Sequence, residues 1–178
     1  MGGDQEGFKM GLEILLKNHL TALKSVFIVL ILMSCAIAYV GSKSGYDLDI
    51  FVFFGIFTVL NVGPAIVLHL EYYSCNKKKK YWISKNSIVE FQGEFERSFK
   101  VEEIDRIVFY MPPSVLKGSE IKFLAIEEYY FAKVIFKNNE SIILTCLLSN
   151  KLESVLSQLE NIKIVRKKAL FASVSFWA

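Results

Sequence analysis

The sequence predicts an α+β membrane protein, in which an N-terminal two-helix transmembrane hairpin precedes an antiparallel β-domain closed by a C-terminal helix. Three observations predict this fold class. Two long apolar stretches, residues 25–42 and 50–70, contain no charged side chain. From residue 81 onward, apolar and polar residues alternate with a period of two, which is typical of half-buried strands. One amphipathic stretch then follows the last of these strands.

The composition excludes several other classes of protein. The chain has 178 residues, of which 53% are hydrophobic, and a formal net charge of +3. Intrinsic disorder, collagen and a disulfide scaffold do not have this composition. The cysteines, Cys35, Cys75 and Cys146, are widely spaced, and the chain has two histidines, His19 and His69. This spacing favours neither a disulfide framework nor a zinc site.

Residues 1–24 are expected to lie in the cytoplasm ahead of the first span. Apolar residues recur in them at helical spacing, which favours an amphipathic helix on the membrane face. The residues concerned are Phe8, Leu12, Leu15, Leu16, His19 and Leu23. The alternative is a plain N-terminal extension of the first transmembrane helix.

Residues 25–42 and 50–70 are predicted to form transmembrane helices. Their 18 and 21 residues correspond to about 27 and about 31 Å of helix, close to the thickness of a hydrocarbon core. Only helices satisfy their own backbone in lipid at this length, and the short connector, 43–49, makes the pair an antiparallel hairpin. The alternatives are two buried helices of a soluble domain, or a signal peptide cleaved near residues 36–38.

Basic residues near the ends of the spans predict the orientation. The connector contains Lys43, whereas Lys77, Lys78, Lys79 and Lys80 follow the second span in a basic linker, residues 71–80. We therefore expect a multi-pass protein of the inner (cytoplasmic) membrane with both termini in the cytoplasm. The same four lysines are candidates for contact with anionic lipid head groups, although a topology signal alone explains them.

Polar residues within the spans are the candidates for an intramembrane contact. Asn61 lies in the second span and Ser34 in the first, and a hydrogen bond between them would join the two helices. The alternative function that Asn61 suggests is a small oligomeric transporter or channel subunit. Gly63 and Pro64 predict a kink in the second helix.

Residues 81–163 are predicted to form the β-domain. Asn138 and Asn139 separate two of its strands and suit a two-residue turn. The predicted strands are 81–84, 88–92, 97–101, 106–111, 121–126, 130–136 and 141–148. Apolar residues at helical spacing between Leu152 and Ile162 predict the closing helix. The tail, 164–178, is left open between an added strand, packing on the membrane and contact with a partner.

The order of these elements resembles the bacterial membrane-anchored pleckstrin-homology-like (PH-like) proteins, the YcxB-like group among them. The resemblance covers about residues 20–163 and rests on the two spans and the segments YWISKNSIVEF, SFKVEEIDRIVFY, YYFAKVIFKNNESIILT and NKLESVLSQLE. It implies a seven-stranded, partly open barrel or sandwich capped by a helix, and it carries over no catalytic residue. The tail after Ile162 and the segment 112–120 depart from the pattern.

The sequence offers no catalytic, metal-binding or cofactor-binding residues. It has no phosphate-binding glycine loop and no nucleophile elbow, and no histidine follows Leu70. We therefore expect no enzyme and no cofactor, but an integral membrane protein that presents an interaction module. The expected partners are membrane lipid, a second copy or another membrane protein. Acidic residues scattered among the aromatic ones argue against nucleic acid.

Overall fold

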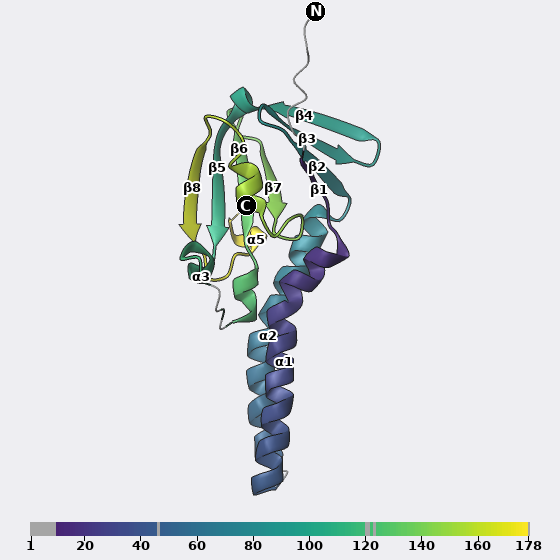
Figure 1. The fold of residues 1–178 in the computed structure, drawn as a ribbon, viewed down its shortest axis with the longest axis vertical. Helices are drawn as coiled ribbons and strands as arrows, with labels where there is room; N and C mark the ends of the chain where they lie inside the picture. Colours follow the sequence, from purple (N-terminus) through teal and green to yellow (C-terminus); the bar gives the residue numbers. More distant parts are fainter. Residues whose placement is uncertain (1–9, 46, 120–121, 123, 178) are drawn as a thin grey trace, which may run out of the picture.

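The computed structural model describes residues 10–45, 47–119, 122 and 124–177. Helices α1 (Leu16–Ser44) and α2 (Leu48–Asn76) form an antiparallel hairpin. Figure 1 shows a β-rich domain that packs around one end of this hairpin, while the other end projects far beyond it. Both helices are longer than the predicted spans, because α1 buries its first turns and α2 its last turns in the domain.

The predicted helix within residues 4–24 begins only at Leu16. Residues 1–9 lie outside the described part of the chain, and Met10–Leu12 form a strand, β1. This strand pairs antiparallel with residues 81–83, some seventy positions away. The helical spacing of the apolar residues could not reveal a pairing across that separation.

Strands β1, β2 (Lys79–Ile83), β3 (Ser87–Gln92) and β4 (Phe95–Lys100) form the first sheet in that order, and all its pairs are antiparallel. Residues 71–80, which were predicted to form a linker, instead belong mostly to regular secondary structure. Residues up to Asn76 continue α2, and Lys79 and Lys80 already belong to β2.

The second sheet has the order β7-β6-β5-β8. Its strands are β5 (Ile104–Met111), β6 (Phe131–Phe136), β7 (Ser141–Thr145) and β8 (Lys163–Lys168). Strand β8 runs parallel to β5, so this sheet is mixed rather than antiparallel. The described residues form two separate four-stranded sheets and no closed barrel.

Short helical segments connect the strands. A 3₁₀ turn, η1 (Val101–Glu103), joins β4 to β5, and helix α3 (Pro113–Leu116) follows β5 directly. The strand predicted over 121–126 is wrong where it can be followed, because residues 125 and 126 begin another 3₁₀ turn, η2 (Ala125–Glu128). Residues 121 and 123 lie outside the described part of the chain. Turn η2 packs against both α1 and α2.

The closing helix is much shorter than its apolar pattern predicts. Helix α4 spans only Leu152–Leu156, although the later apolar residue of that pattern, Leu159, is also buried. The chain must turn back before β8 begins, and Asn161 takes a left-handed conformation, φ 60°, in that turn. The tail after β8 ends in a short helix, α5 (Val174–Trp177).

The turn between β6 and β7 lies where it was predicted, but it is longer than the predicted two-residue turn. The Asn139 N–H donates to the carbonyl of Phe136, and the Phe136 N–H donates to the carbonyl of Glu140. Asn139 has φ 66°. This geometry is typical of a three-residue loop in which a left-handed residue follows a type I turn.

The predicted end of the strand before Pro112 is confirmed. Strand β5 ends at Met111 and is followed by Pro112 and Pro113, of which Pro113 opens α3. Proline suits a strand end and a helix start because it lacks a backbone donor.

An asparagine at the end of α2 fastens the hairpin to the second sheet. The Asn76 amide nitrogen donates to the carbonyl of Ile143 at 2.9 Å. Its amide oxygen accepts from the backbone N–H and the hydroxyl of Thr145 at 3.2 and 2.8 Å. The side chain thus bonds to the edge of β7 in place of a neighbouring strand. Asn18 on α1 donates to the carbonyls of Leu147 and Leu148.

Candidate functional site

The hairpin divides into an upper half packed on the domain and a stalk, which we define as residues 27–61. In the upper half, α2 buries one helical face, formed by Val62, Ala65, Leu68, Tyr72 and Asn76. In the described part of the stalk, Gly41 is the only buried residue. Large apolar side chains of the stalk lie exposed, namely Phe27, Ile28, Leu30, Ile31, Leu32, Tyr39, Leu48, Phe51, Val52, Phe53, Ile56, Phe57, Val59 and Leu60.

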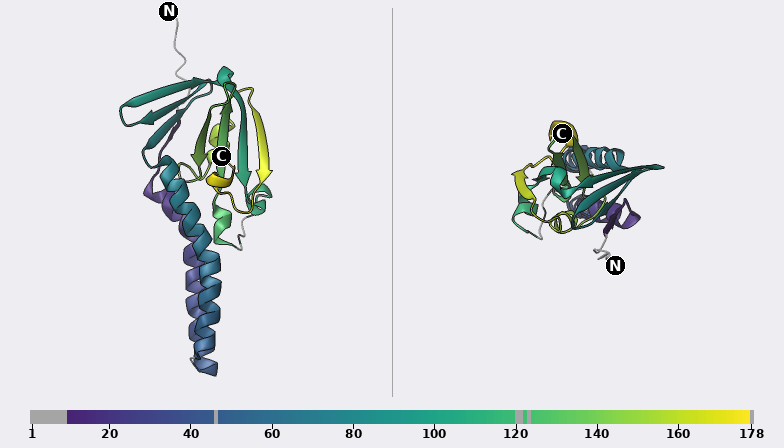
Figure 2. Two further views of the ribbon diagram at one scale, coloured as in Figure 1. Left: turned by 180° about the vertical axis from the view of Figure 1, so that it is seen from behind. Right: turned by 90° about the horizontal axis from the view of Figure 1, so that it is seen from above.

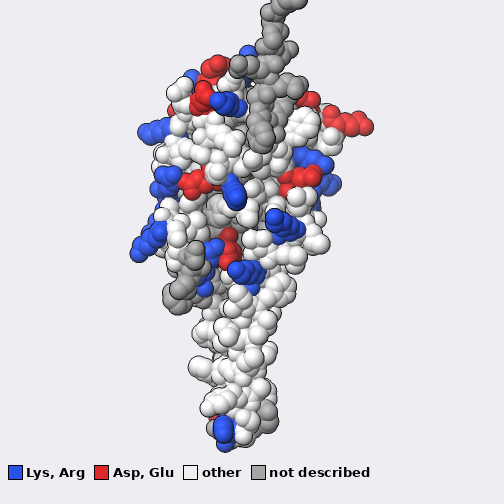
Figure 3. Space-filling view, in the orientation of Figure 1, with Lys and Arg blue, Asp and Glu red and all other residues white. Residues whose placement is uncertain are grey.

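The distribution of charge follows the same division. Figure 3 shows basic and acidic side chains over the domain and again at the far tip of the hairpin, with an uncharged stretch between them. The sequence has no charged residue from 27 to 42 or from 50 to 61. Both helices are long and apolar enough to cross a membrane. On α1 the stalk covers residues 27–44, about 27 Å of helix, which approaches the thickness of a hydrocarbon core.

A polar cluster marks the level where the stalk meets the domain. The Ser25 hydroxyl on α1 donates to the Glu128 carboxylate on η2 at 2.7 Å, and Glu128 forms an ion pair with Lys122. Pro64 lies within α2, and Figure 1 shows a bend of the hairpin as it leaves the domain. The missing N–H of proline explains a bend at this point.

The predicted contact between Asn61 and Ser34 is not formed. The Ser34 hydroxyl donates to the carbonyl of Leu30 in its own helix, and the side-chain oxygen of Asn61 is buried without a hydrogen-bond partner. His19 and His69 face each other across the hairpin, so Asn61 is level with residue 27, about 10 Å along the axis from Ser34. The register of the two helices could not be read from the sequence.

The four lysines lie at the domain end of α2, far from the stalk. Lys79 pairs with Glu90 at 2.9 Å and Lys80 with Glu13 at 2.8 Å, while Lys77 and Lys78 are exposed. Lys77 lies fifteen positions after Val62, which corresponds to about 22 Å of helix. Contact of these lysines with lipid head groups stays a prediction, and it would need a bilayer at this level rather than around the stalk.

Both histidines of the chain meet in the upper half of the hairpin. The His19 Nδ1 and His69 Nε2 atoms are 2.8 Å apart, and His69 Nδ1 lies 3.0 Å from the Tyr129 hydroxyl. Burial raises the pKa of the Tyr129 phenol well above its ordinary value, so the phenol keeps its proton and can donate to His69. The chain of hydrogen bonds ties α1, α2 and the end of η2 together. Nothing in the sequence indicated that the two histidines, fifty positions apart, would lie in contact.

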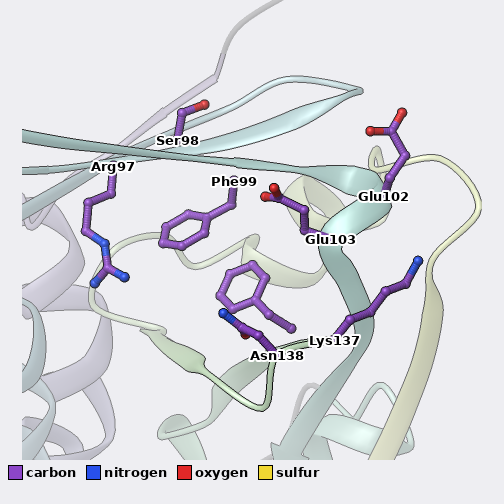
Figure 4. Close-up of a pocket in the computed structure, with 8 residues that line it drawn as sticks. Arg97, Ser98, Phe99, Glu102, Glu103, Lys137 and Asn138 are labelled. Atoms are coloured by element: carbon purple, nitrogen blue, oxygen red, sulfur yellow. The ribbon is translucent and has the colours of Figure 1, made fainter.

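A cavity of about 570 Å³ opens at the end of the domain remote from the stalk. Its floor is the stacked pair Phe99 and Phe136, whose ring centroids are 4.4 Å apart. Figure 4 shows side chains of both charges around these rings, contributed by β4, η1 and the turn between β6 and β7. The lining residues are Arg97, Ser98, Phe99, Glu102, Glu103, Phe136, Lys137 and Asn138.

Arg97 bridges the two sheets across one side of this cavity. Its guanidinium carbon lies 5.2 Å from the centre of the Phe99 ring, and one of its nitrogens pairs with Glu140 at 3.2 Å. An aromatic floor with a rim of both charges suits an amphipathic ligand. Sequence analysis missed this cavity because its residues come from three separate segments.

Comparison with protein families matches residues 13–155 to a PH domain family. The chain belongs to the PH domain family. The match includes the helical hairpin and strands β2 to β7, and it leaves out β1 and β8. PH domains are in general interaction modules without catalytic activity. No curated protein matches the chain.

Two features of the described residues bear on metal and thiol chemistry in this PH domain. Among the described residues, no three histidine, cysteine, aspartate or glutamate side chains gather as a metal site would require. Burial raises the pKa of the Cys146 thiol to about 12, so this thiol stays protonated at neutral pH and is a poor nucleophile.

Proposed function

We propose that the protein is a membrane-anchored, non-catalytic interaction module. The stalk spans the bilayer and holds the PH domain against one membrane face. The observation that carries this proposal is the division of the hairpin at residues 26 and 62. Above it, one face of each helix is buried against the domain and contributes hydrogen-bonded polar side chains. Below it, the helices are exposed and carry no charge until the tip, at residues 43–49. Exposed apolar surface of this extent is rare in water and marks an interface with lipid or protein.

The polar cluster at the top of the stalk supports the same placement. Ser25, Glu128 and Lys122 lie at the level where the stalk begins, and ionic groups are stable in the interfacial region but not in the hydrocarbon core. The tip of the hairpin carries Lys43, Asp47 and Asp49, which matches a second interface at the other end of the stalk. The stalk therefore has polar borders at both ends, and on α1 its length approaches that of a hydrocarbon core.

The proposed orientation places the domain and both termini in the cytoplasm of a bacterial cell, with the hairpin tip outside the inner membrane. The domain side has more basic than acidic residues, with a balance of +4 over residues 71–178. The resemblance to the YcxB-like group supports the same arrangement. A reporter fused at Gly45 and one fused at the C-terminus should report opposite sides of the membrane.

The decisive experiment separates membranes from the soluble fraction of cells that express the intact chain. We expect the protein in the pellet after an alkaline carbonate wash, and in the supernatant only with detergent. Recovery of the folded protein in the supernatant without detergent would contradict the anchoring.

The cavity at the far end of the domain is the proposed partner site. Because the stalk leaves from the opposite end (Figure 1), this cavity faces away from the bilayer that the stalk would span. That position favours a protein partner over lipid of the same membrane.

A photo-crosslinking residue at Asn138, in the cavity rim, should capture a partner in cells. The same residue at Ser157, an exposed position outside the cavity, is the matched control. Equal capture at both positions would show that the cavity is not the site.

A further inference from the structure

The C-terminal segment occupies an edge of the PH domain that the rest of the fold leaves open. We call residues 163–177, which contain β8 and α5, the strap. Strand β5 has β6 on one side and the strap on the other. The family match ends at residue 155, so the strap lies beyond the matched domain. Without it, β5 would be an edge strand with unpaired backbone groups.

The strand part of the strap is less buried than the other strands, although Ile164 and Val165 pack against the core. None of the six residues of β8 is buried, and four of them are basic. It also forms the sole parallel pair among the described strands, and parallel pairing is slightly less stable per residue. By contrast, Ile107 and Phe109 of β5 are fully buried.

The second part of the strap is fastened by one carboxylate. Glu71 on α2 accepts hydrogen bonds from the Ser173 hydroxyl at 3.1 Å, from the Ser175 N–H at 2.7 Å and from the Ser175 hydroxyl. The Tyr72 hydroxyl adds a bond to the carbonyl of Ala172. We call the three bonds to Glu71 the clasp.

We call the surface of the domain that the strap covers the seat. The chemistry of the seat determines which kind of segment can bind there. Glu153 pairs with Arg166 of the strap at 2.6 Å, and the Lys167 ammonium lies 5.6 Å from the centre of the Tyr110 ring. After the strand, Ala169 and Ala172 are almost completely buried, so the recess below β5 takes small side chains. The seat therefore fits an extended basic strand followed by a segment of small apolar residues.

We propose that the edge of β5 now covered by the strap is a docking site for an extended basic segment. The strap is its built-in occupant, and it can be released. Opening the clasp removes the strap and uncovers both the β5 edge and the buried groups beneath it. Because that surface is apolar, an incoming segment of the same chemistry replaces the strap rather than leaving the edge bare. This site lies apart from the cavity, and it does not depend on the stalk spanning a membrane.

The test opens the clasp with a single charge. Ser175→Asp places a carboxylate against Glu71, where like charges repel. In the detergent-solubilised intact protein, we expect trypsin to cut at the basic residues of β8 at least tenfold faster than in the wild type. A labelled synthetic peptide of residues 161–178 should bind the variant at least tenfold more tightly than the wild type, because the wild-type seat is filled.

The matched controls separate release from general damage. Ser141→Asp adds the same charge at the exposed start of β7, on the far side of the sheet from β8 and outside the cavity, and should leave both measurements unchanged. Ser175→Asp combined with Glu71→Lys replaces repulsion by attraction and should return cleavage and peptide binding close to wild-type values. Either of two results would overturn the proposal. One is a folded Ser175→Asp variant with wild-type cleavage and peptide binding, and the other is faster cleavage spread equally over β2 and β8.

Discussion

The two halves of the hairpin are built on the same two helices but have opposite surroundings. In the upper half, polar side chains such as Asn18, Ser25 and Asn76 are buried and hydrogen-bonded to the β-domain. In the stalk, apolar side chains are exposed and Asn61 lacks a partner for its oxygen. The same two helices thus contribute to the domain core in one half and project beyond the domain in the other, and their contacts with the sheets mark where the two halves meet.

The largest expected effect contrasts the two asparagines of α2. Asn76→Ala leaves the buried groups of Ile143 and Thr145 unpaired, so we expect the free energy of unfolding of the domain to fall by about 4 kcal/mol. Asn61→Ala should change it by less than about 0.5 kcal/mol, because no hydrogen bond of its oxygen is lost. Urea unfolding in detergent, followed by near-UV circular dichroism, measures both. An equal loss of unfolding free energy in the two variants would contradict the distinction between the upper half and the stalk.

The second contrast places an arginine in each half of α1. Ile31 in the stalk and Leu16 in the upper half are both exposed, at 62% and 75%. Ile31→Arg should disfavour membrane insertion by about 3 kcal/mol, the penalty for arginine near the centre of a span. Leu16→Arg should leave insertion unchanged. The fraction that resists carbonate extraction reports the difference, and normal insertion of Ile31→Arg would show that the stalk does not lie in lipid.

A smaller effect contrasts two serines of α1. Ser25→Ala removes a hydrogen bond to the Glu128 carboxylate and should lower the free energy of unfolding by about 2 kcal/mol. Ser34→Ala removes a bond to its own helix and should change it by less than about 0.5 kcal/mol. Thermal unfolding of the detergent-solubilised variants measures both. A larger loss of unfolding free energy for Ser34→Ala than for Ser25→Ala would contradict the boundary between the upper half and the stalk.

The last contrast is a dependence on alkaline pH that involves Cys146. Its folded-state pKa is raised to about 12, so above the ordinary thiol pKa the unfolded state loses a proton that the folded state keeps. Stability should therefore fall as pH rises from about 9 toward 12, by up to about 1.4 kcal/mol per pH unit from this group. Cys146→Ala should make the decline shallower, whereas Cys35→Ala, at an exposed stalk position, should not. An unchanged slope in Cys146→Ala would contradict the assignment.

Local signals predicted the elements whose cause lies within a few residues. The absence of charge located both apolar helices, Asn139 located a turn and Pro112 ended a strand. The errors share another cause. Strand β1 and strand β8 each depend on a partner strand more than fifty positions away, and their own residues carry no period-two pattern that could outweigh the neighbouring helical one.

The candidate sites were harder to predict than the fold. Lys77–Lys80 were expected beside a bilayer because the sequence placed them directly after an apolar run, but α2 continues through the domain before it reaches them. The cavity over Phe99 and Phe136 and the clasp at Glu71 combine segments distant in the chain. No spacing rule links such residues, since each site arises from the packing of two sheets and a hairpin.

The order of apolar and alternating segments determined, without further information, that a helical hairpin precedes a β-domain, because hydrophobic periodicity is a property of neighbouring residues. Only the tertiary structure decided where the hairpin stops being domain core and where the tail lies. Those boundaries depend on which helix turns find hydrogen-bond partners such as Thr145 and Glu128 in distant parts of the chain. Burial of a polar group is favourable only where such a partner exists.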